Sequence, residues 1–120
     1  MLTVRIDNVG DASIVECEGT IVSAEDSSVL RDAAMARQPV GVIVMDLSKV
    51  WATAGNGLSM LVFLQCWAHD RGIQLKLFNP RSSVRYAITD ASSPRDLDFA
   101  SVGEVTELLI HAANDHPLAA

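Results

Sequence analysis

The chain is poor in basic residues, and it lacks long uncharged apolar segments. Nine Lys and Arg residues stand against 15 Asp and Glu residues, which gives a net charge of −6. Electrostatic binding to nucleic acid or to an anionic membrane needs clustered Lys and Arg, so this charge argues against both functions. A membrane-spanning helix needs a predominantly apolar run of about 20 residues, and we find none in the sequence.

Cysteine is also scarce, with Cys17 and Cys66 as the two residues of this type. Their spacing fits no zinc motif, and both lie in apolar segments. We therefore expect two buried thiols, because an unpaired Cys packs as a small hydrophobic side chain; a reactive thiol is the alternative. The N-terminal residues show no basic region followed by an apolar one, so we expect no signal peptide and a cytoplasmic protein.

The chain does contain enough apolar residues for a core, since 49% of its 120 residues are hydrophobic. A chain of this length corresponds to one domain. We place that domain at residues 1–112 and expect residues 113–120, which include Pro117, to form a flexible C-terminal tail.

Hydrophobic periodicity predicts strands that alternate with helices. Period-2 patterns predict strands at 2–7, 13–18 and 73–77, and a β-branched run bounded by Gly41 predicts a strand at 42–47. A short fifth strand is expected at 97–99. Helical spacing predicts helices at 23–38, 56–69, 84–91 and 101–112. This order predicts an α/β fold with a mixed four- to five-stranded sheet and about four helices, mainly on one face of the sheet.

Particular residues are expected to mark the ends of these helices. Ser23 and Asn56 are typical N-caps for the first and second helices, and Ser101 with Glu104 has the spacing of a capping box before the last helix. Gly72 is expected just after the second helix, where glycine commonly ends a helix.

Few residues have a pattern that indicates catalysis. His69, His111 and His116 have no metal-ligand spacing, and we expect surface or helix-end positions for them. The acidic pairs Glu25-Asp26 and Asp96/Asp98 are typical of helix starts and turns. The sequence contains no nucleophile elbow and no phosphate-binding loop. We expect no enzymatic activity, no metal and no cofactor.

The segment from Val40 to Asp70 is the most informative part of the chain. A buried strand, a glycine-containing loop and an apolar helix form half of a βαβ unit, and such loops usually carry the working surface of α/β folds. We therefore expect the function at Thr53–Ser59. Free N–H groups at Gly55-Asn56-Gly57 could bind an anion, but no basic residue is close, so a tight turn is the expected role.

The helix that follows this loop has almost no polar face. Leu58, Leu61 and Val62 can face the core, while Met60, Phe63 and Trp67 lie on another side at positions i, i+3 and i+7. Either neighbouring helices cover that second side, or it forms an exposed apolar patch that binds a protein.

The chain resembles the STAS domain, the fold of anti-sigma factor antagonists, over roughly residues 2–112. The resemblance rests on Cys17-Glu18-Gly19 at the end of the second strand, on the segment 44–50, on Gly57-Leu58 at the start of the helix, and on Asn79-Pro80 before Val84. The predicted order of elements is also that of the family.

The resemblance implies a phosphorylation switch that this sequence lacks. In phosphorylated members, an Asp-Ser-Ser-Gly-Leu or Asp-Thr-x-Gly-Leu motif places a Ser or Thr phosphoacceptor at the start of the helix. Aligning Gly57-Leu58 puts Ala54 at the Asp, Gly55 at the phosphoacceptor and Asn56 at the next position, and Val22 falls where an earlier Asp often lies. Because Gly55 has no hydroxyl group, we expect no phosphorylation there; Thr53 and Ser59 are the available substitutes.

The family resemblance and the loop together predict a non-enzymatic protein-interaction regulator that resembles an anti-sigma factor antagonist. The expected partner is an anti-sigma factor with a kinase-type fold, and the apolar helix surface could also support a homodimer. The expected contact residues are Thr53, Ala54, Gly55, Asn56, Ser59, Met60 and Phe63. The alternative is a cytoplasmic STAS accessory subunit of a lipid-transporting ABC system.

Overall fold

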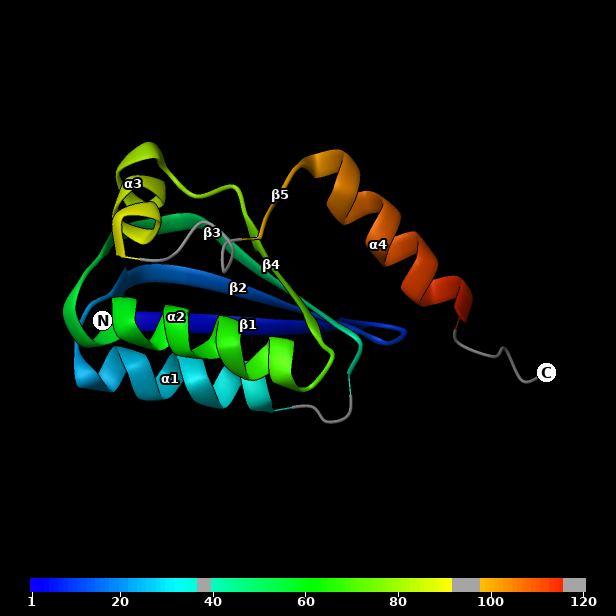
Figure 1. The fold of residues 1–120 in the computed structure, drawn as a ribbon, viewed down its shortest axis with the longest axis horizontal. Coiled ribbons are helices and arrows are strands. Elements are labelled where there is room, and N and C mark those ends of the chain that lie inside the picture. Colours follow the sequence, from blue (N-terminus) through cyan, green and yellow to red (C-terminus); the bar gives the residue numbers. More distant parts are fainter. Residues whose placement is uncertain (37–39, 92–97, 116–120) are drawn as a thin grey trace.

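The computed structural model describes residues 1–36, 40–91 and 98–115, without the side chains of residues 114 and 115. The described elements follow in the order β1 (Leu2–Val9), β2 (Ala12–Ile21), α1 (Ala24–Met35), β3 (Val42–Thr53), α2 (Gly55–Asp70), β4 (Gln74–Phe78), α3 (Ser82–Ala91), β5 (Phe99–Ala100) and α4 (Val102–Asp115) (Figure 1). The strands form a sheet in the order β1-β2-β3-β4-β5. β1 is antiparallel to β2 and the other neighbours are parallel, which confirms the predicted mixed sheet.

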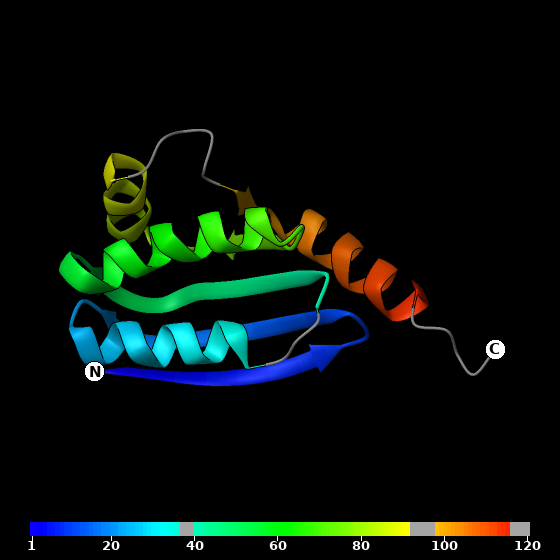
Figure 2. The same ribbon diagram turned by 60° about the horizontal axis from the view of Figure 1, so that its bottom comes forward.

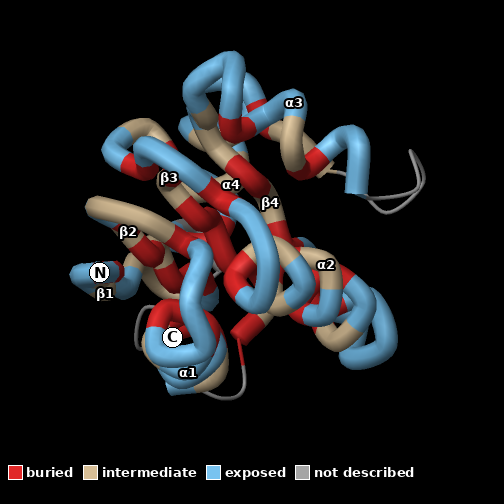
Figure 3. Tube along the Cα trace, turned by 90° about the vertical axis from the view of Figure 1, so that its left-hand side faces the viewer, coloured by how far each residue is buried: buried red, intermediate tan, exposed pale blue. Residues whose placement is uncertain are grey.

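The main core lies between one face of the sheet and the helices α1, α2 and α3. Alternate residues of β1, β2, β3 and β4 point into it and meet one apolar side of each helix, as in Val15, Met45, Leu30, Leu64 and Ile88. Figure 3 shows the buried residues along the inner sides of these strands and helices. The prediction that helices lie mainly on one face is confirmed.

Helix α4 covers the other face of the sheet with a smaller core. Its residue Ala112 is buried with Ala12, Val42 and Val44, while Val105, Leu108 and Leu109 are only partly buried against them. Figures 1 and 2 show that α4 extends away from the other three helices. Because β3 is covered on both faces, its first residues form a continuous apolar run rather than an alternating one.

Strand β3 is longer than predicted. The expected strand ended at Leu47, but the observed strand continues to Thr53. Two register shifts interrupt the pairing of β2 with β3, between Glu16 and Glu18 and between Gly19 and Thr20. Such bulges break the two-residue alternation of side chains, and the sequence pattern therefore hides the second half of the strand.

The helix ends agree with the sequence in part. The N-cap at Ser23 and the capping box at Ser101 are confirmed, and Ser23 also forms a capping box with Asp26. The prediction that Asn56 caps α2 was wrong, because α2 begins at Gly55 and its N-cap is Ala54. Gly72 follows α2 with φ +71°, as expected.

The described residues differ from the expected boundaries at three other places. Helix α1 ends at Met35, and Gln38 lies outside the described residues. β5 begins at Phe99, and Leu97 lies outside the described part. Helix α4 continues to Asp115, past the boundary expected at residue 112.

The two cysteines do not share one environment. Cys17 is buried, whereas the prediction of a buried Cys66 was wrong, because its side chain is on the exposed side of α2. Gln65, the preceding residue, occupies the buried position instead. In the part of the chain that the structure describes, no helix is long and apolar enough to cross a membrane.

Gly10 provides a test of how α4 is attached. It has φ +54° in the β1–β2 turn, and a Cβ atom there would overlap the carbonyl group of Ala112 in α4. A Gly10→Ala substitution should lower the free energy of unfolding by at least about 1–2 kcal/mol, the cost of a left-handed conformation for a residue with a Cβ atom. Urea unfolding followed by circular dichroism measures this change.

The matched control is Gly103→Ala in the first turn of α4, where the nearest atom to a new Cβ would be Ser101 Oγ at 3.8 Å. This substitution should leave the free energy of unfolding unchanged or raise it slightly, because alanine favours helix. Equal losses from both substitutions would contradict the packing of the turn against α4.

Candidate functional site

The candidate site lies where the start of α2 meets the end of β2. The amide of Ala54 donates a hydrogen bond to the carbonyl of Ile21 at 3.2 Å, and the amide of Gly57 donates to the carbonyl of Val22 at 3.0 Å. Two chain segments that are more than thirty residues apart are therefore held side by side. Figure 1 shows this end of the sheet beside the N-terminus and the first turns of α1 and α2.

The two glycines of this turn are there for different reasons. Gly55 has φ +51°, and the nearest atom to a Cβ would be the Val22 carbonyl oxygen at 3.5 Å, so conformation rather than space favours glycine. A Cβ at Gly57 would overlap the Ile21 carbonyl group, so here the close contact itself requires glycine.

Thr53 is not at the surface, where the sequence analysis placed it. Thr53 is only 7% exposed, and its hydroxyl group donates a hydrogen bond to the Ile21 carbonyl oxygen at 3.1 Å. Thr53 therefore stabilises the turn from inside. It can meet a partner or a kinase only if this hydrogen bond opens.

The other predicted contact residues divide by exposure. Phe63 is 51% exposed, whereas Met60 is half-buried and packs against the core. Trp67 also packs against the core, and the Arg71 guanidinium lies 5.6 Å from the centre of its ring. The predicted Met60–Phe63–Trp67 surface is thus reduced to Phe63 as its exposed member.

The exposed residues around the turn form one surface, which we call the docking edge. Its members are Val22, Ala54, Gly55, Asn56, Ser59 and Phe63. Asn56, Ser59 and Phe63 share one side of α2, because they are three and four residues apart. No Asp, Glu, Lys or Arg occurs from Val50 to Ala68, so the α2 part of this surface carries no formal charge.

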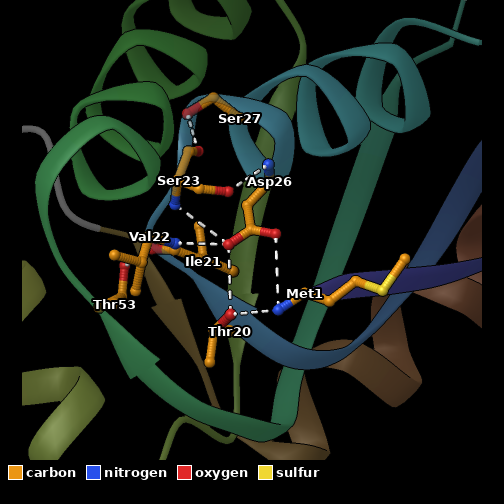
Figure 4. Close-up of polar contacts among 8 residues, drawn as sticks. All are labelled: Met1, Thr20, Ile21, Val22, Ser23, Asp26, Ser27 and Thr53. Atoms are coloured by element: carbon orange, nitrogen blue, oxygen red, sulfur yellow. Dashed lines mark hydrogen bonds and ion pairs between the residues drawn. The ribbon is translucent and has the colours of Figure 1, made fainter.

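Asp26 holds the β2–α1 segment beside the docking edge (Figure 4). Its carboxylate accepts hydrogen bonds from the amides of Val22 and Ser23, at 3.0 and 3.1 Å, and from the Thr20 hydroxyl group at 3.2 Å. The N-terminal amine of Met1 lies 3.9 Å from its other oxygen. The hydrogen bond from the Val22 amide is the main reason that the pKa of Asp26 is lowered to about 2, although burial opposes this shift.

Trp51 is an exposed residue that the sequence analysis did not single out. It is 62% exposed, and it lies between Val50 and Ala52, where the pairing of β2 with β3 shifts. Bulges often turn a side chain outward near functional sites. A tryptophan beside Ser48 and Lys49 could have indicated an exposed aromatic residue. It was missed because the predicted strand ended at Leu47, before Trp51.

The Cys and His side chains of the described residues show no arrangement for catalysis or metal binding. Burial is the main cause that raises the pKa of the Cys17 thiol to about 12, which keeps the thiol protonated and unreactive. His69 and His111 are exposed near helix ends, and His116 lies outside the described residues. Among the residues that the structure describes, no group of three His, Cys, Asp or Glu side chains could hold a metal ion.

Comparison with solved structures assigns the chain to a known fold. An anti-sigma factor antagonist from Mycobacterium paratuberculosis superposes with a TM-score of 0.70 and 16% identity, over 96% of this chain and 96% of that one. The anti-sigma factor antagonist SpoIIAA in its unphosphorylated form gives a TM-score of 0.70 and 12% identity, over 91% of this chain and 97% of that one. The chain therefore has the α/β fold of the STAS domain, as the sequence predicted.

The same fold also occurs inside a larger protein. The murine anion transporter Slc26a9 matches with a TM-score of 0.69 and 16% identity, over 88% of this chain but only 18% of the transporter. No family model and no curated protein matches the sequence. At these identities the structural likeness establishes the fold, and the function has to be argued from the site.

The lowered pKa of Asp26 predicts a defined pH dependence of stability. The carboxylate is stabilised in the folded state, so its contribution is complete above the ordinary pKa of 3.8 and is lost as the pH falls towards about 2. An Asp26→Asn variant lacks this contribution. The difference in free energy of unfolding between wild type and variant should therefore shrink steadily between about pH 4 and pH 2.

The neighbouring exposed residue Glu25 supplies the control, since it accepts none of the hydrogen bonds that hold the segment. Unfolding of Glu25→Gln by urea at the same pH values should match the wild type closely. A stability difference for Asp26→Asn that does not change with pH would show that the carboxylate is not bound as described.

Proposed function

We propose that this chain is a non-enzymatic interaction module that binds a protein partner through the docking edge, in the manner of an anti-sigma factor antagonist. The partner that we expect is an anti-sigma factor with a kinase-type fold. The observation that carries the proposal is the exposed, uncharged α2 start around Gly55, whose neighbours Ala54 and Gly57 donate hydrogen bonds to the carbonyl groups of Ile21 and Val22.

The physical character of the docking edge supports this proposal. Half-exposed Phe63 offers an aromatic ring that a partner could cover, and aromatic residues often dominate binding energy at protein interfaces. The small residues Ala54 and Gly55 let a partner approach the backbone closely. Because the surface has no charge of its own, a partner can cover it without removing water from an unpaired ion.

The fold comparison also supports partner binding of this kind. Several matching structures are named anti-sigma factor antagonists, and SpoIIAA is known in an unphosphorylated and a phosphorylated form. A phosphate adds nearly two negative charges, which would oppose docking on an uncharged surface. For this chain we propose docking without such a switch.

The hydroxyl groups near Gly55 support unswitched docking. Gly55 has no hydroxyl group, and the Thr53 hydroxyl is buried against Ile21. Ser59 is exposed on the docking edge, one turn further along α2, and is the second substitute acceptor predicted from the sequence. Phosphorylation of Ser59 is therefore the modification that would overturn this part of the proposal.

Removing the Phe63 ring tests the docking edge. The tagged wild-type chain is used to recover partners from a lysate of the native organism, and mass spectrometry identifies them. A kinase-type anti-sigma factor is the expected partner. With Phe63→Ala, the dissociation constant measured with that purified partner should rise about tenfold or more.

The matched control is Ile110→Ala on α4, which removes a side chain of similar exposure, 56% against 51%, from a distant helix. This variant should bind as the wild type does. Recovery of the ATPase and permease subunits of a transporter would favour the alternative function, an accessory subunit of an ABC system. Equal binding by the Phe63→Ala variant would reject the docking edge.

The absent switch can be tested by restoring it. The wild-type chain, incubated with the recovered kinase and Mg-ATP, should keep its unmodified mass and its affinity. The double variant Ala54→Asp, Gly55→Ser should gain one phosphate and then bind more weakly. The new serine must adopt φ +51° or rearrange the turn, so a stability loss of about 1–2 kcal/mol is expected as well.

Gly55→Ala is the control for that stability loss, because it introduces the same backbone strain without a hydroxyl group. Phosphate on the wild-type chain at Ser59 or Thr53 would contradict unswitched docking. Unchanged binding by the phosphorylated double variant would contradict the electrostatic argument.

A further inference from the structure

The second half of α2 borders a hollow that the docking edge does not use. It has a volume of about 590 Å³ and lies between α2, the start of β4 and Asp98. The residues of α2 that line it are Gln65, Cys66, His69 and Asp70, and Ile73 and Leu75 supply an apolar side. The docking edge begins at the opposite end of the same helix, so the two sites are separate.

Gln65 is the unusual residue of this hollow. It is 7% exposed, and its side-chain nitrogen and oxygen are both buried with no hydrogen-bond partner among the described residues. A buried polar group without a partner costs about 1–3 kcal/mol, so native proteins seldom keep one without a reason. A hydrophobic residue of similar size would serve packing better at this position.

The charges at the hollow limit what could bind there. Asp70 and Asp98 both line it, and the Lys76 ammonium lies 2.8 Å from Asp98 and balances that carboxylate. Asp70 has no ion pair among the described residues, so the hollow disfavours phosphates and carboxylates. A neutral ligand fits this charge, and Ile73 and Leu75 favour one with an apolar part.

We propose that this hollow binds a small neutral molecule with a cis-amide edge, and that the Gln65 side chain recognises that edge. The Gln65 amide offers one donor and one acceptor side by side, which a cis-amide complements with two hydrogen bonds. Rotation about the side-chain torsions χ1 and χ2 would carry the amide from its buried position into the hollow when the ligand enters. The ligand would then satisfy the two polar atoms that the protein leaves without partners.

The test uses 2-pyridone, a small neutral lactam, and NMR of the ¹⁵N-labelled chain. The side-chain amide signals of Gln65 and the backbone amides of Ile73 and Leu75 should shift together and saturate. A fragment of this size is expected to bind with a dissociation constant in about the millimolar range. N-methyl-2-pyridone, which has lost the donor, should bind at least about tenfold more weakly, because it leaves one polar pair unmade.

Gln65→Met is the matched variant, because it keeps the length of the side chain and removes both polar atoms. It should raise the melting temperature of the free protein and abolish saturable binding of 2-pyridone. Ser59→Ala, on the docking edge, should leave the binding of 2-pyridone unchanged. A loss of 2-pyridone binding can therefore be distinguished from a loss of partner binding. The proposal is overturned if 2-pyridone gives no saturable Gln65 shift, if both lactams bind equally, or if Gln65→Met binds as the wild type does.

Discussion

The backbone carbonyl groups of Ile21 and Val22 are the contacts on which the candidate site depends. The Ile21 oxygen accepts hydrogen bonds from the Ala54 amide and the Thr53 hydroxyl, and the Val22 oxygen accepts one from Gly57. A Cβ at Gly57 would not fit against Ile21, and Asp26 fixes the Val22 amide from the other side. The start of α2 is therefore positioned by backbone contacts, which leaves its outward residues free to vary.

The contacts that hold the turn are thus separate from the side chains that form its surface. The positive φ of Gly55 and the buried Thr53 hydroxyl are local features of the turn, and neither contributes an exposed hydroxyl group. In the docking that we propose, this uncharged surface binds its partner without a phosphate switch. The other half of α2 carries the unpartnered Gln65, so one helix borders two chemically different surfaces.

The sequence predicted the elements and their order better than it predicted the site. Continuous burial of 42–45 and the alternation of 2–7 are one-dimensional patterns, and both appear in the strands as expected. The second half of β3 was missed because bulges depend on the partner strand. In α2, nine of the eleven residues from Leu58 to Ala68 are apolar, so no polar side orients this stretch in the sequence, and the exposure of Cys66 and the burial of Gln65 could not be predicted.

The most direct test of the central claim is hydrogen exchange of the chain, alone and bound to its purified partner, with the intact mass measured in the same experiment. We predict slower exchange on binding in residues 20–23 and 54–63 of an unphosphorylated chain. Protection confined to α4, or protection at α2 that appears only when the chain carries a phosphate, would contradict it.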